Sequence, residues 1–221
     1  MTASETKRRL TTSERRRRAT TAALRHLRRA DPRLREIIAR VGAFRPVITP
    51  DPFVALVGSI VHQQVSMSAA AAIQRRLCEL FPGRRVRPAA LLQLSQPALR
   101  GAGLSRQKAL YLRGLAAAFA DGTLSAAKLR RMSDDEVIAA TTALKGIGRW
   151  TAEMLLMFRL GRSDVLPVDD YGIRKAMQQA YRKRALPKAA WMRRVAEPWR
   201  PYRTVACWYL WRSGDGTAGK A

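Results

Sequence analysis

The sequence predicts an all-α fold, organised as two helical lobes with a cleft between them and containing a helix-hairpin-helix motif. Three observations indicate this class. Apolar residues recur at helical spacing along most of the chain, no segment shows the alternation of a strand, and strong capping signals bound the helices. With 221 residues, 47% of them hydrophobic, the chain can bury a substantial core in one large or two small lobes.

The N-terminal segment, residues 1–18, is basic and nearly free of apolar side chains, so we expect a flexible arm outside the core. It includes the run Arg15–Arg18. Residues 19–221 should fold as a single unit of two lobes. One lobe is expected to span about residues 51–165, and the other to combine the N-terminal helices with about residues 170–212.

Two Asp-Pro pairs mark helix starts, because each places an N-cap carboxylate before a proline in the first turn. Asp31-Pro32 begins a helix that should end before Gly42, and Asp51-Pro52 begins another that should end near His62. Further helices are expected at about residues 66–80, 89–94, 96–100 and 105–121.

A capping box of Ser133 and Glu136 opens the helix that leads into a tight hairpin at residues 144–148, where Gly146 and Gly148 interrupt the apolar pattern. A glycine-rich turn at a helix N-terminus presents unpaired N–H groups and the positive end of the helix dipole, so the hairpin is a candidate phosphate grip. The remaining helices are expected at about residues 149–160, 170–181, 188–196 and 202–211.

The charge balance predicts a polyanionic partner. The chain carries 42 Lys and Arg against 16 Asp and Glu, a net charge of +26, so nucleic acid is the first candidate. No apolar run approaches the roughly 20 residues of a membrane span, and the N-terminus lacks the apolar core of a secretory signal. We therefore expect an intracellular protein without membrane association, in the cytoplasm or nucleoid of a bacterium or the nucleus or mitochondria of a eukaryote.

The N-terminus is compatible with a mitochondrial presequence as well as with the basic arm of a DNA-binding protein, since both are arginine-rich and acid-poor. The only cysteines, Cys78 and Cys207, are too far apart for a zinc or iron–sulfur motif. The sequence therefore predicts no metal cluster.

Asp169 and Asp170 stand where a helix should begin. One interpretation is structural, because aspartate is a common helix N-cap, but one cap does not need two carboxylates. The other is catalytic, because an ionised carboxylate favours the positive charge that develops on a sugar when a glycosidic bond breaks. No Ser–His–Asp or Cys–His set competes with this pair, since His26 and His62 are the only histidines.

Two further groups of side chains leave both a structural and a functional interpretation open. Gln63-Gln64 ends an apolar helix and is either a solvated terminus or a polar loop that fills the gap left by a displaced base. Aromatic residues with interspersed arginines near the C-terminus, Trp199 and Tyr202 among them, form either the edge of a core or a stacking wall for a base.

The order of these motifs resembles the endonuclease III superfamily of DNA glycosylases, which carry a helix-hairpin-helix and Gly/Pro–Asp motif. Residues 144–152 followed by 166–170 bear this resemblance. Residues 61–66 and 199–212 are similar to the 3-methyladenine DNA glycosylase II branch. The similarity covers about residues 30–212 and matches the compact members, which lack an N-terminal β-rich domain.

The resemblance implies that Asp170 is the catalytic carboxylate and that Asp169 is the helix cap or supporting acid. It implies DNA-phosphate binding by the hairpin and the first turn after it, at Gly146, Gly148, Arg149 and Thr151. It also implies that main-chain carbonyls can hold a structural Na⁺ or K⁺, at Thr142, Leu144 and Ile147. No other cofactor is expected.

The same resemblance implies which residues recognise the base. The implied pocket residues are Trp150, Met154, Tyr202 and Trp199. Gln63 and Gln64 match the loop that fills the vacated space in the duplex, and we expect Gln64 to be the plug. Met154 replaces a ring found in relatives, and Trp150 stands where bifunctional relatives have the lysine that forms a Schiff base. We therefore expect a glycosylase without lyase activity.

Together these inferences predict a monomeric, monofunctional glycosylase that flips alkylated purines, above all 3-methyladenine, out of double-stranded DNA and hydrolyses the glycosidic bond. One alternative is excision of a mismatched, deaminated or oxidised base, which would use the same fold and carboxylate. Another is a non-catalytic helix-hairpin-helix module that recognises DNA structure. Such a module would need the hairpin but not Asp170.

Overall fold

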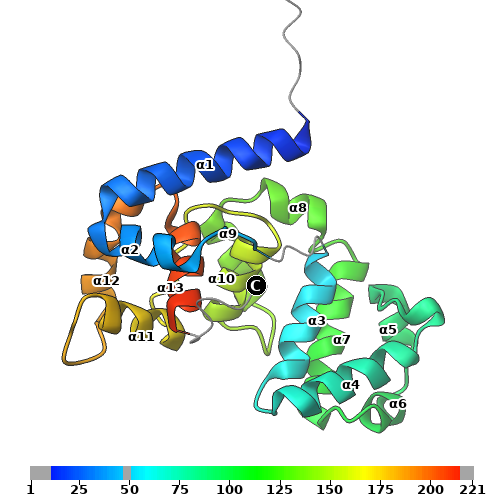
Figure 1. Cartoon of the computed structure of the whole chain (residues 1–221). Helices are drawn as coiled ribbons and strands as arrows, with labels where there is room; N and C mark the ends of the chain where they lie inside the picture. Colours follow the sequence, from blue (N-terminus) through cyan, green and yellow to red (C-terminus); the bar gives the residue numbers. More distant parts are fainter. Residues whose placement is uncertain (1–10, 47–50, 215–221) are drawn as a thin grey trace, which may run out of the picture. The chain divides into compact units, whose positions relative to one another are not determined.

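The all-α prediction is confirmed by the structure, a computed structural model that describes residues 11–46 and 51–214. Over these residues the chain forms thirteen α-helices and two short 3₁₀ helices, and it contains no strand (Figure 1). None of the helices within these ranges has the length and apolar character that a membrane span requires.

The chain divides into two compact units. Unit 1 comprises residues 1–46 and 163–221, and unit 2 comprises residues 47–162. The sequence placed these divisions near residues 51 and 165. Unit 1 is therefore built from both ends of the chain, and unit 2 from its middle.

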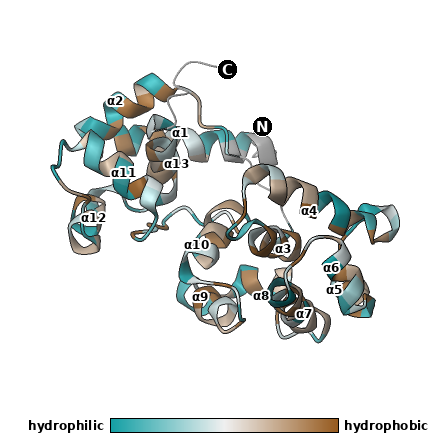
Figure 2. Cartoon of the chain, turned by 90° about the horizontal axis from the view of Figure 1, so that it is seen from below, coloured by the Kyte–Doolittle hydropathy of each residue, from teal (hydrophilic) through white to brown (hydrophobic). Residues whose placement is uncertain are grey.

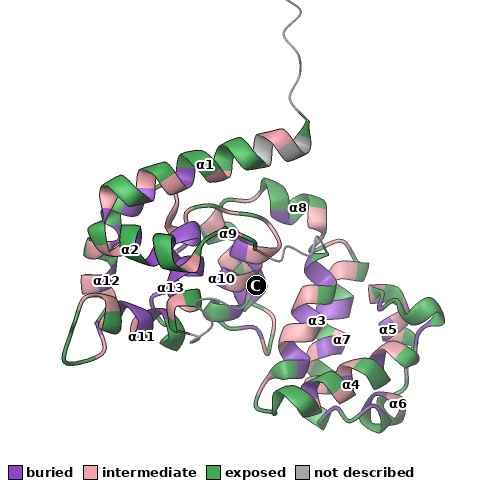
Figure 3. Cartoon of the chain, in the orientation of Figure 1, coloured by how far each residue is buried: buried purple, intermediate pink, exposed green. Residues whose placement is uncertain are grey.

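Unit 1 is organised around its last helix. Its elements are α1 (Thr12–Ala30), α2 (Pro32–Val41), α11 (Tyr171–Ala180), α12 (Ala189–Val195), η2 (Glu197–Trp199) and α13 (Arg203–Gly214). Helix α13 contacts α1, α2 and α11, and all of its residues from 204 to 210 are buried (Figure 3). A helix that is covered on all sides in this way forms the centre of the core.

Helix α1 begins earlier than expected. Residues 12–18 were assigned to the basic arm, but they belong to the helix, and residues 1–10 lie outside the described part of the chain. The reason is a capping box: the Glu14 backbone N–H donates to Thr11 Oγ1 at 3.2 Å, and the Thr11 backbone N–H donates to the Glu14 carboxylate at 2.8 Å. This box pairs two N–H groups that would otherwise be unpaired at the helix start.

Asp31, between α1 and α2, has a buried carboxylate, 6% exposed, that connects the start of α2 with η2 and with the end of α11. Its Oδ1 caps α2 by accepting from the backbone N–H groups of Arg33 and Leu34 at 2.8 and 3.3 Å. Its Oδ2 accepts from Trp199 Nε1 at 2.8 Å and from the Tyr181 hydroxyl. Burial, and then the hydrogen bond to Asp31, raises the pKa of Tyr181 above its ordinary value.

Unit 2 is assembled around α3, whose apolar residues appear brown in Figure 2. Its elements are α3 (Pro52–His62), α4 (Met67–Glu79), η1 (Pro82–Arg84), α5 (Pro88–Gln93), α6 (Gln96–Gly101), α7 (Arg106–Ala120), α8 (Ala126–Arg131), α9 (Asp134–Thr142) and α10 (Arg149–Phe158). Helix α3 packs against α7, α4 and α10, and α10 also packs against α9.

Helix α8 was not predicted. It is a six-residue helix with one buried residue, Leu129, so no apolar periodicity marks it. The local signal is its cap, since Ser125 Oγ accepts from the Lys128 backbone N–H at 3.2 Å. A single serine is too common to predict a helix alone.

Candidate functional site

Asp170 is the N-cap of α11 and is 8% exposed. Its Oδ1 accepts from the Ile173 backbone N–H at 2.7 Å and from the indole Nε1–H of Trp211 on α13 at 2.9 Å. Gly172 leaves room for this indole, because a Cβ there would lie 2.9 Å from Trp211 Cδ1. Two donors from different helices thus fix the orientation of the carboxylate.

The assignment of Asp169 as the helix cap is wrong. Asp169 is exposed, whereas the side chain of Asp170 makes the capping bond. The turn before the helix decides this: the Asp170 backbone N–H donates to the Pro167 carbonyl at 3.1 Å, and the helix starts at Tyr171. The residue directly before the first helical residue is the cap by position.

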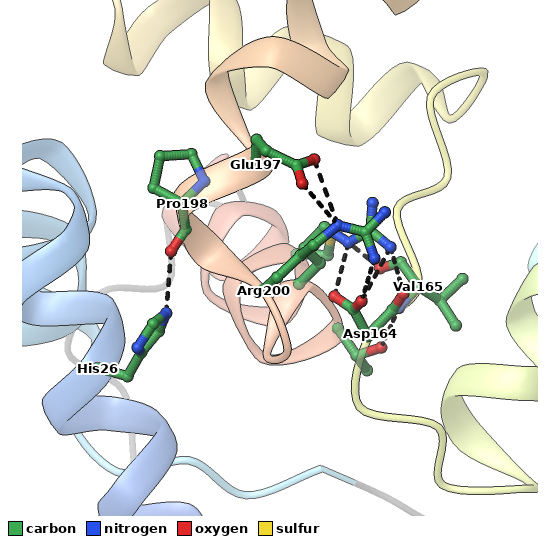
Figure 4. Close-up of polar contacts among 9 residues, drawn as sticks. His26, Asp164, Val165, Glu197, Pro198 and Arg200 are labelled. Atoms are coloured by element: carbon green, nitrogen blue, oxygen red, sulfur yellow. Dashed lines mark hydrogen bonds and ion pairs between the residues drawn. The ribbon is translucent and has the colours of Figure 1, made fainter.

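The loop that leads to Asp170 is fastened to the C-terminal part of unit 1 through Asp164 (Figure 4). The Asp164 carboxylate accepts from Arg203 Nε at 2.6 Å and from Arg200 Nη1 at 2.8 Å. The Val165 backbone N–H donates to Thr204 Oγ1 at 3.0 Å. These bonds hold both the loop and α13, the two elements that supply Asp170 and Trp211.

The hairpin has the geometry that its glycines require. Gly146 has a φ of +89°, and a Cβ on it would lie 2.2 Å from Cδ2 of Tyr111 on α7. Gly148 is the N-cap of α10 and supplies no side-chain cap. The first N–H groups of α10 are therefore not capped by the preceding residue, which leaves them suited to bind an anion.

The two polar residues in the first turn of α10 differ in burial. Arg149 is exposed and forms an ion pair with Glu153, with its Nε 3.1 Å from Oε1. Thr151 is buried at 6% exposure, so only its main chain could serve the predicted phosphate contact.

The two glutamines differ in their contacts and exposure. Gln63, the C-cap of α3, donates from Nε2 to the Gly146 carbonyl at 2.7 Å and so ties this loop to the hairpin. Gln64 is exposed and has a φ of +53°. Lys108 on α7 donates from Nζ to the Val61 carbonyl at 2.8 Å, which also holds the end of α3, and burial lowers the pKa of this lysine.

The predicted aromatic pocket residues differ in accessibility. Trp150, in unit 2, is 49% exposed, and Tyr202, in unit 1, is half-buried and packs edge-on against His26 with a centroid distance of 5.4 Å. The assignment of Trp199 to the pocket is wrong, because its ring is fully buried and its N–H donates to Asp31. Trp199 therefore belongs to the core of unit 1.

Two residues beside Asp170 were missed by the sequence analysis. Trp211 donates to its carboxylate, and Tyr171, the next residue in the chain, is 66% exposed. The position of Tyr171 directly after the acid was a usable signal. Trp211 was one of several aromatic residues near the C-terminus. Which of them reaches Asp170 depends on how α13 packs, and the sequence alone does not show this.

No cluster of three or more His, Cys, Asp and Glu side chains that could hold a metal ion occurs in the described ranges. The carbonyls of Thr142, Leu144 and Ile147 lie at the end of α9 and in the hairpin. The Leu144 carbonyl accepts from the Ile147 backbone N–H at 3.2 Å, which leaves its second lone pair for another partner.

Comparison with known proteins gives consistent matches. A family model described as HhH-GPD superfamily base excision DNA repair protein matches residues 57–201. The chain is 33% identical over 193 residues to DNA-3-methyladenine glycosylase 1 of Schizosaccharomyces pombe, with 85% of each protein covered.

Two solved structures share the fold at substantial sequence identity. A DNA-3-methyladenine glycosidase from Bacillus halodurans has a TM-score of 0.80 and 38% identity, with 87% of this chain and 89% of that chain covered. A 3-methyladenine DNA glycosylase of Schizosaccharomyces pombe in complex with abasic DNA has a TM-score of 0.79 and 31% identity, with 90% of this chain and all of that chain covered.

Proposed function

The chain belongs to the HhH-GPD superfamily of base excision DNA repair proteins, and from this membership we propose that it is a DNA glycosylase that removes alkylated purines, 3-methyladenine above all. The observation that carries the proposal is the carboxylate of Asp170, which is buried and accepts two hydrogen bonds. It stands at the position that the resemblance gives to the catalytic acid. The relative bound to abasic DNA supports DNA as the partner, and we propose that the protein binds it as a monomer.

In this mechanism Asp170 acts by electrostatics. As the C1′–N bond lengthens, positive charge develops on the sugar, and a fixed carboxylate stabilises that charge without having to reorient. Alkylation leaves the base cationic, so it departs as a neutral molecule and needs little protonation. The bond's electron pair goes to the base, and water then adds to C1′ and loses its proton.

The experiment that tests this function is mass spectrometry of the bases released from methylated, deaminated and oxidised DNA. Release of 3-methyladenine supports the proposal. Release of only uracil, thymine or 8-oxoguanine would reassign the substrate, and release of no base at all would favour a non-catalytic DNA-binding module.

We propose that the hairpin grips a DNA phosphate through the first N–H groups of α10, and Gly148→Asp tests this. The new carboxylate would accept those N–H groups and repel phosphate, so affinity for all duplexes, damaged or not, should fall about tenfold. Stability should be unchanged or higher, since aspartate is a better N-cap than glycine.

Gly148→Asn is the matched control for this variant, because it has the same shape without the charge. Duplex affinity is measured by titration at fixed salt, alongside the melting temperature. Equal affinity of wild type and Gly148→Asp for undamaged DNA would exclude the phosphate grip.

We propose that Gln64 fills the space of the flipped base and that Gln63 holds this loop to the hairpin. Gln64→Ala should slow excision from duplex DNA about tenfold, since it removes the group that replaces the unstacked base. Excision from single-stranded DNA should change little, because no stack has to be filled. Equal losses on both substrates would contradict the plug role.

We propose that bond cleavage uses no divalent metal and that the only ion is a structural Na⁺ or K⁺ on the carbonyls of Thr142, Leu144 and Ile147. Carbonyl oxygens are suitable ligands for such ions, and the Leu144 carbonyl keeps a lone pair. The ion would neutralise the carbonyl dipoles and stiffen the hairpin. Excision should therefore persist in EDTA, and its loss there would contradict the proposal.

We propose that the enzyme leaves an intact abasic strand. Strand cleavage through a Schiff base needs an amine with an available lone pair, and Trp150 stands where that lysine would be. Product strands should break only after alkali or heat, and borohydride should trap no protein–DNA adduct. A trapped adduct mapped to any lysine, Lys145 included, would overturn this assignment.

A further inference from the structure

Helix α1 of unit 1 carries a basic face that the core does not use. Among its described side chains only Ala23 and Leu27 are buried, and both lie in the second half of the helix. Figure 3 shows α1 at the surface of unit 1, with most of its outward side exposed. The exposed side chains include five arginines, Arg17, Arg18, Arg25, Arg28 and Arg29. This face is therefore open to a partner.

Arg25 and Arg29 form a ridge on this face, because residues four apart lie on the same side of a helix. A groove of about 600 Å³ borders the ridge and is also lined by Arg28 and by Arg35 of α2. Arg35 is held at the end of α1, since its Nε donates to the Arg28 carbonyl at 2.9 Å. A second groove, of about 520 Å³, also borders both ridge residues. Four arginines thus gather around one groove.

No acid balances this group in the part of the chain that the structure describes. Residues 11–35 contain nine arginines and only two acids, Glu14 and Asp31. Glu14 belongs to the capping box at the other end of α1, and Asp31 is buried in the contacts described above. None of the four groove arginines has a carboxylate oxygen within 4.0 Å among residues 11–46 and 51–214.

The fold alone does not explain this arrangement. Like charges four residues apart on a helix are destabilising, and the ridge is such a pair. Cations in the last turn of a helix gain stability from the helix dipole, which accounts for Arg28 and Arg29. That effect is confined to the last turn, so it does not account for Arg25. A polyanion on the groove would offset the repulsion.

The uncharged residues of this face indicate which polyanion fits. The exposed ones with described side chains are short: Ala19, Thr21 and Ala22. An acidic protein or a membrane surface would need apolar anchors beside the charges, because protein interfaces and amphipathic membrane helices bury aromatic or long aliphatic side chains. DNA phosphates need none. An arginine fork binds phosphate oxygens directly, and short neighbours let the DNA backbone approach closely.

We propose that the α1 arginines and Arg35 form a second DNA-binding surface, which binds backbone phosphates of duplex DNA regardless of sequence or damage. The inference takes DNA as the partner from the proposed function and goes beyond it, since the hairpin belongs to unit 2 and this surface to unit 1. Contacts to phosphate alone hold a protein on undamaged DNA and let it slide along the duplex. The surface therefore serves the search for a damaged base.

The test measures affinity for undamaged duplex DNA over a range of salt concentrations. Replacing both ridge residues, by Arg25→Gln and Arg29→Gln together, should lower affinity at moderate salt about tenfold. The slope of log affinity against log salt should fall by about 2, since each lost phosphate contact removes about one released counterion. The pair Arg25→Lys and Arg29→Lys keeps both charges and should restore most of this slope.

The matched control is Arg193→Gln with Arg194→Gln, which removes two charges from exposed positions of α12 in the same unit. Its slope should change less than that of the ridge pair. The melting temperature of the ridge glutamine pair should be unchanged or higher, because glutamine is also a good helix former and the like-charge repulsion is removed.

An unchanged slope in the ridge glutamine pair would overturn the inference, and an equal fall in the control would do the same by indicating a general effect of net charge. Weaker binding to phosphatidylserine vesicles with unchanged duplex affinity would also overturn it and assign the face to a membrane surface. Release of no damaged base by the wild type would contradict the proposed glycosylase activity alone, because undamaged DNA is bound without excision.

Discussion

Asp170→Asn should lower the single-turnover rate of base excision by about 100- to 1,000-fold and leave duplex affinity unchanged or higher, because it removes charge and keeps shape. An asparagine oxygen can still accept from the Ile173 N–H and the Trp211 indole, which now donate to Oδ1. The fold should therefore survive the substitution. The measurement is the excision rate at saturating enzyme together with the melting temperature.

Two further variants test whether the loss of excision activity is specific to the Asp170 carboxylate. Asp169→Asn, at an exposed residue, should change neither rate nor stability appreciably. Trp211→Phe removes the indole donor but keeps an aromatic ring, so its rate should fall less than that of Asp170→Asn. A slower rate for Asp169→Asn than for Asp170→Asn would move the catalytic role to Asp169.

The sequence predicted most helices because their start signals are local. Asp31-Pro32, Asp51-Pro52 and the box of Ser133 with Glu136 all cap helices in the structure, where each acceptor lies within three residues of its donor. The prediction missed α8, because this helix has no apolar periodicity. It also assigned residues 12–18 to an arm on their basic composition, although the capping box of Thr11 and Glu14 starts a helix there.

The candidate site was predictable only in part for the same reason. The hairpin glycines and the acid at the start of α11 are fixed by spacing within short segments. The partners of the aromatic residues are not, since Trp199 donates to Asp31 and Trp211 donates to Asp170 across 168 and 41 residues. No nearby residue types distinguish a tryptophan buried beside Asp31 from one beside Asp170.

The bonds at Asp31 predict the second large effect, which concerns stability. Asp31→Ala should lower the free energy of unfolding by about 3–5 kcal/mol, because it removes a helix cap and leaves one buried and one half-buried donor unpaired. Those donors are the Trp199 indole and the Tyr181 hydroxyl. Urea unfolding followed by tryptophan fluorescence measures the change, with Trp199 itself as a buried reporter.

Asp51→Ala is the matched control for this variant. Asp51 also precedes a proline and accepts from the next two available N–H groups of its helix, those of Phe53 and Val54 at 2.9 and 3.2 Å, but it is exposed. Its loss should cost about 1 kcal/mol, the usual value of an N-cap. The difference between the two variants measures what the bonds from Trp199 and Tyr181 add, and equal losses would show that Asp31 contributes no more than a cap.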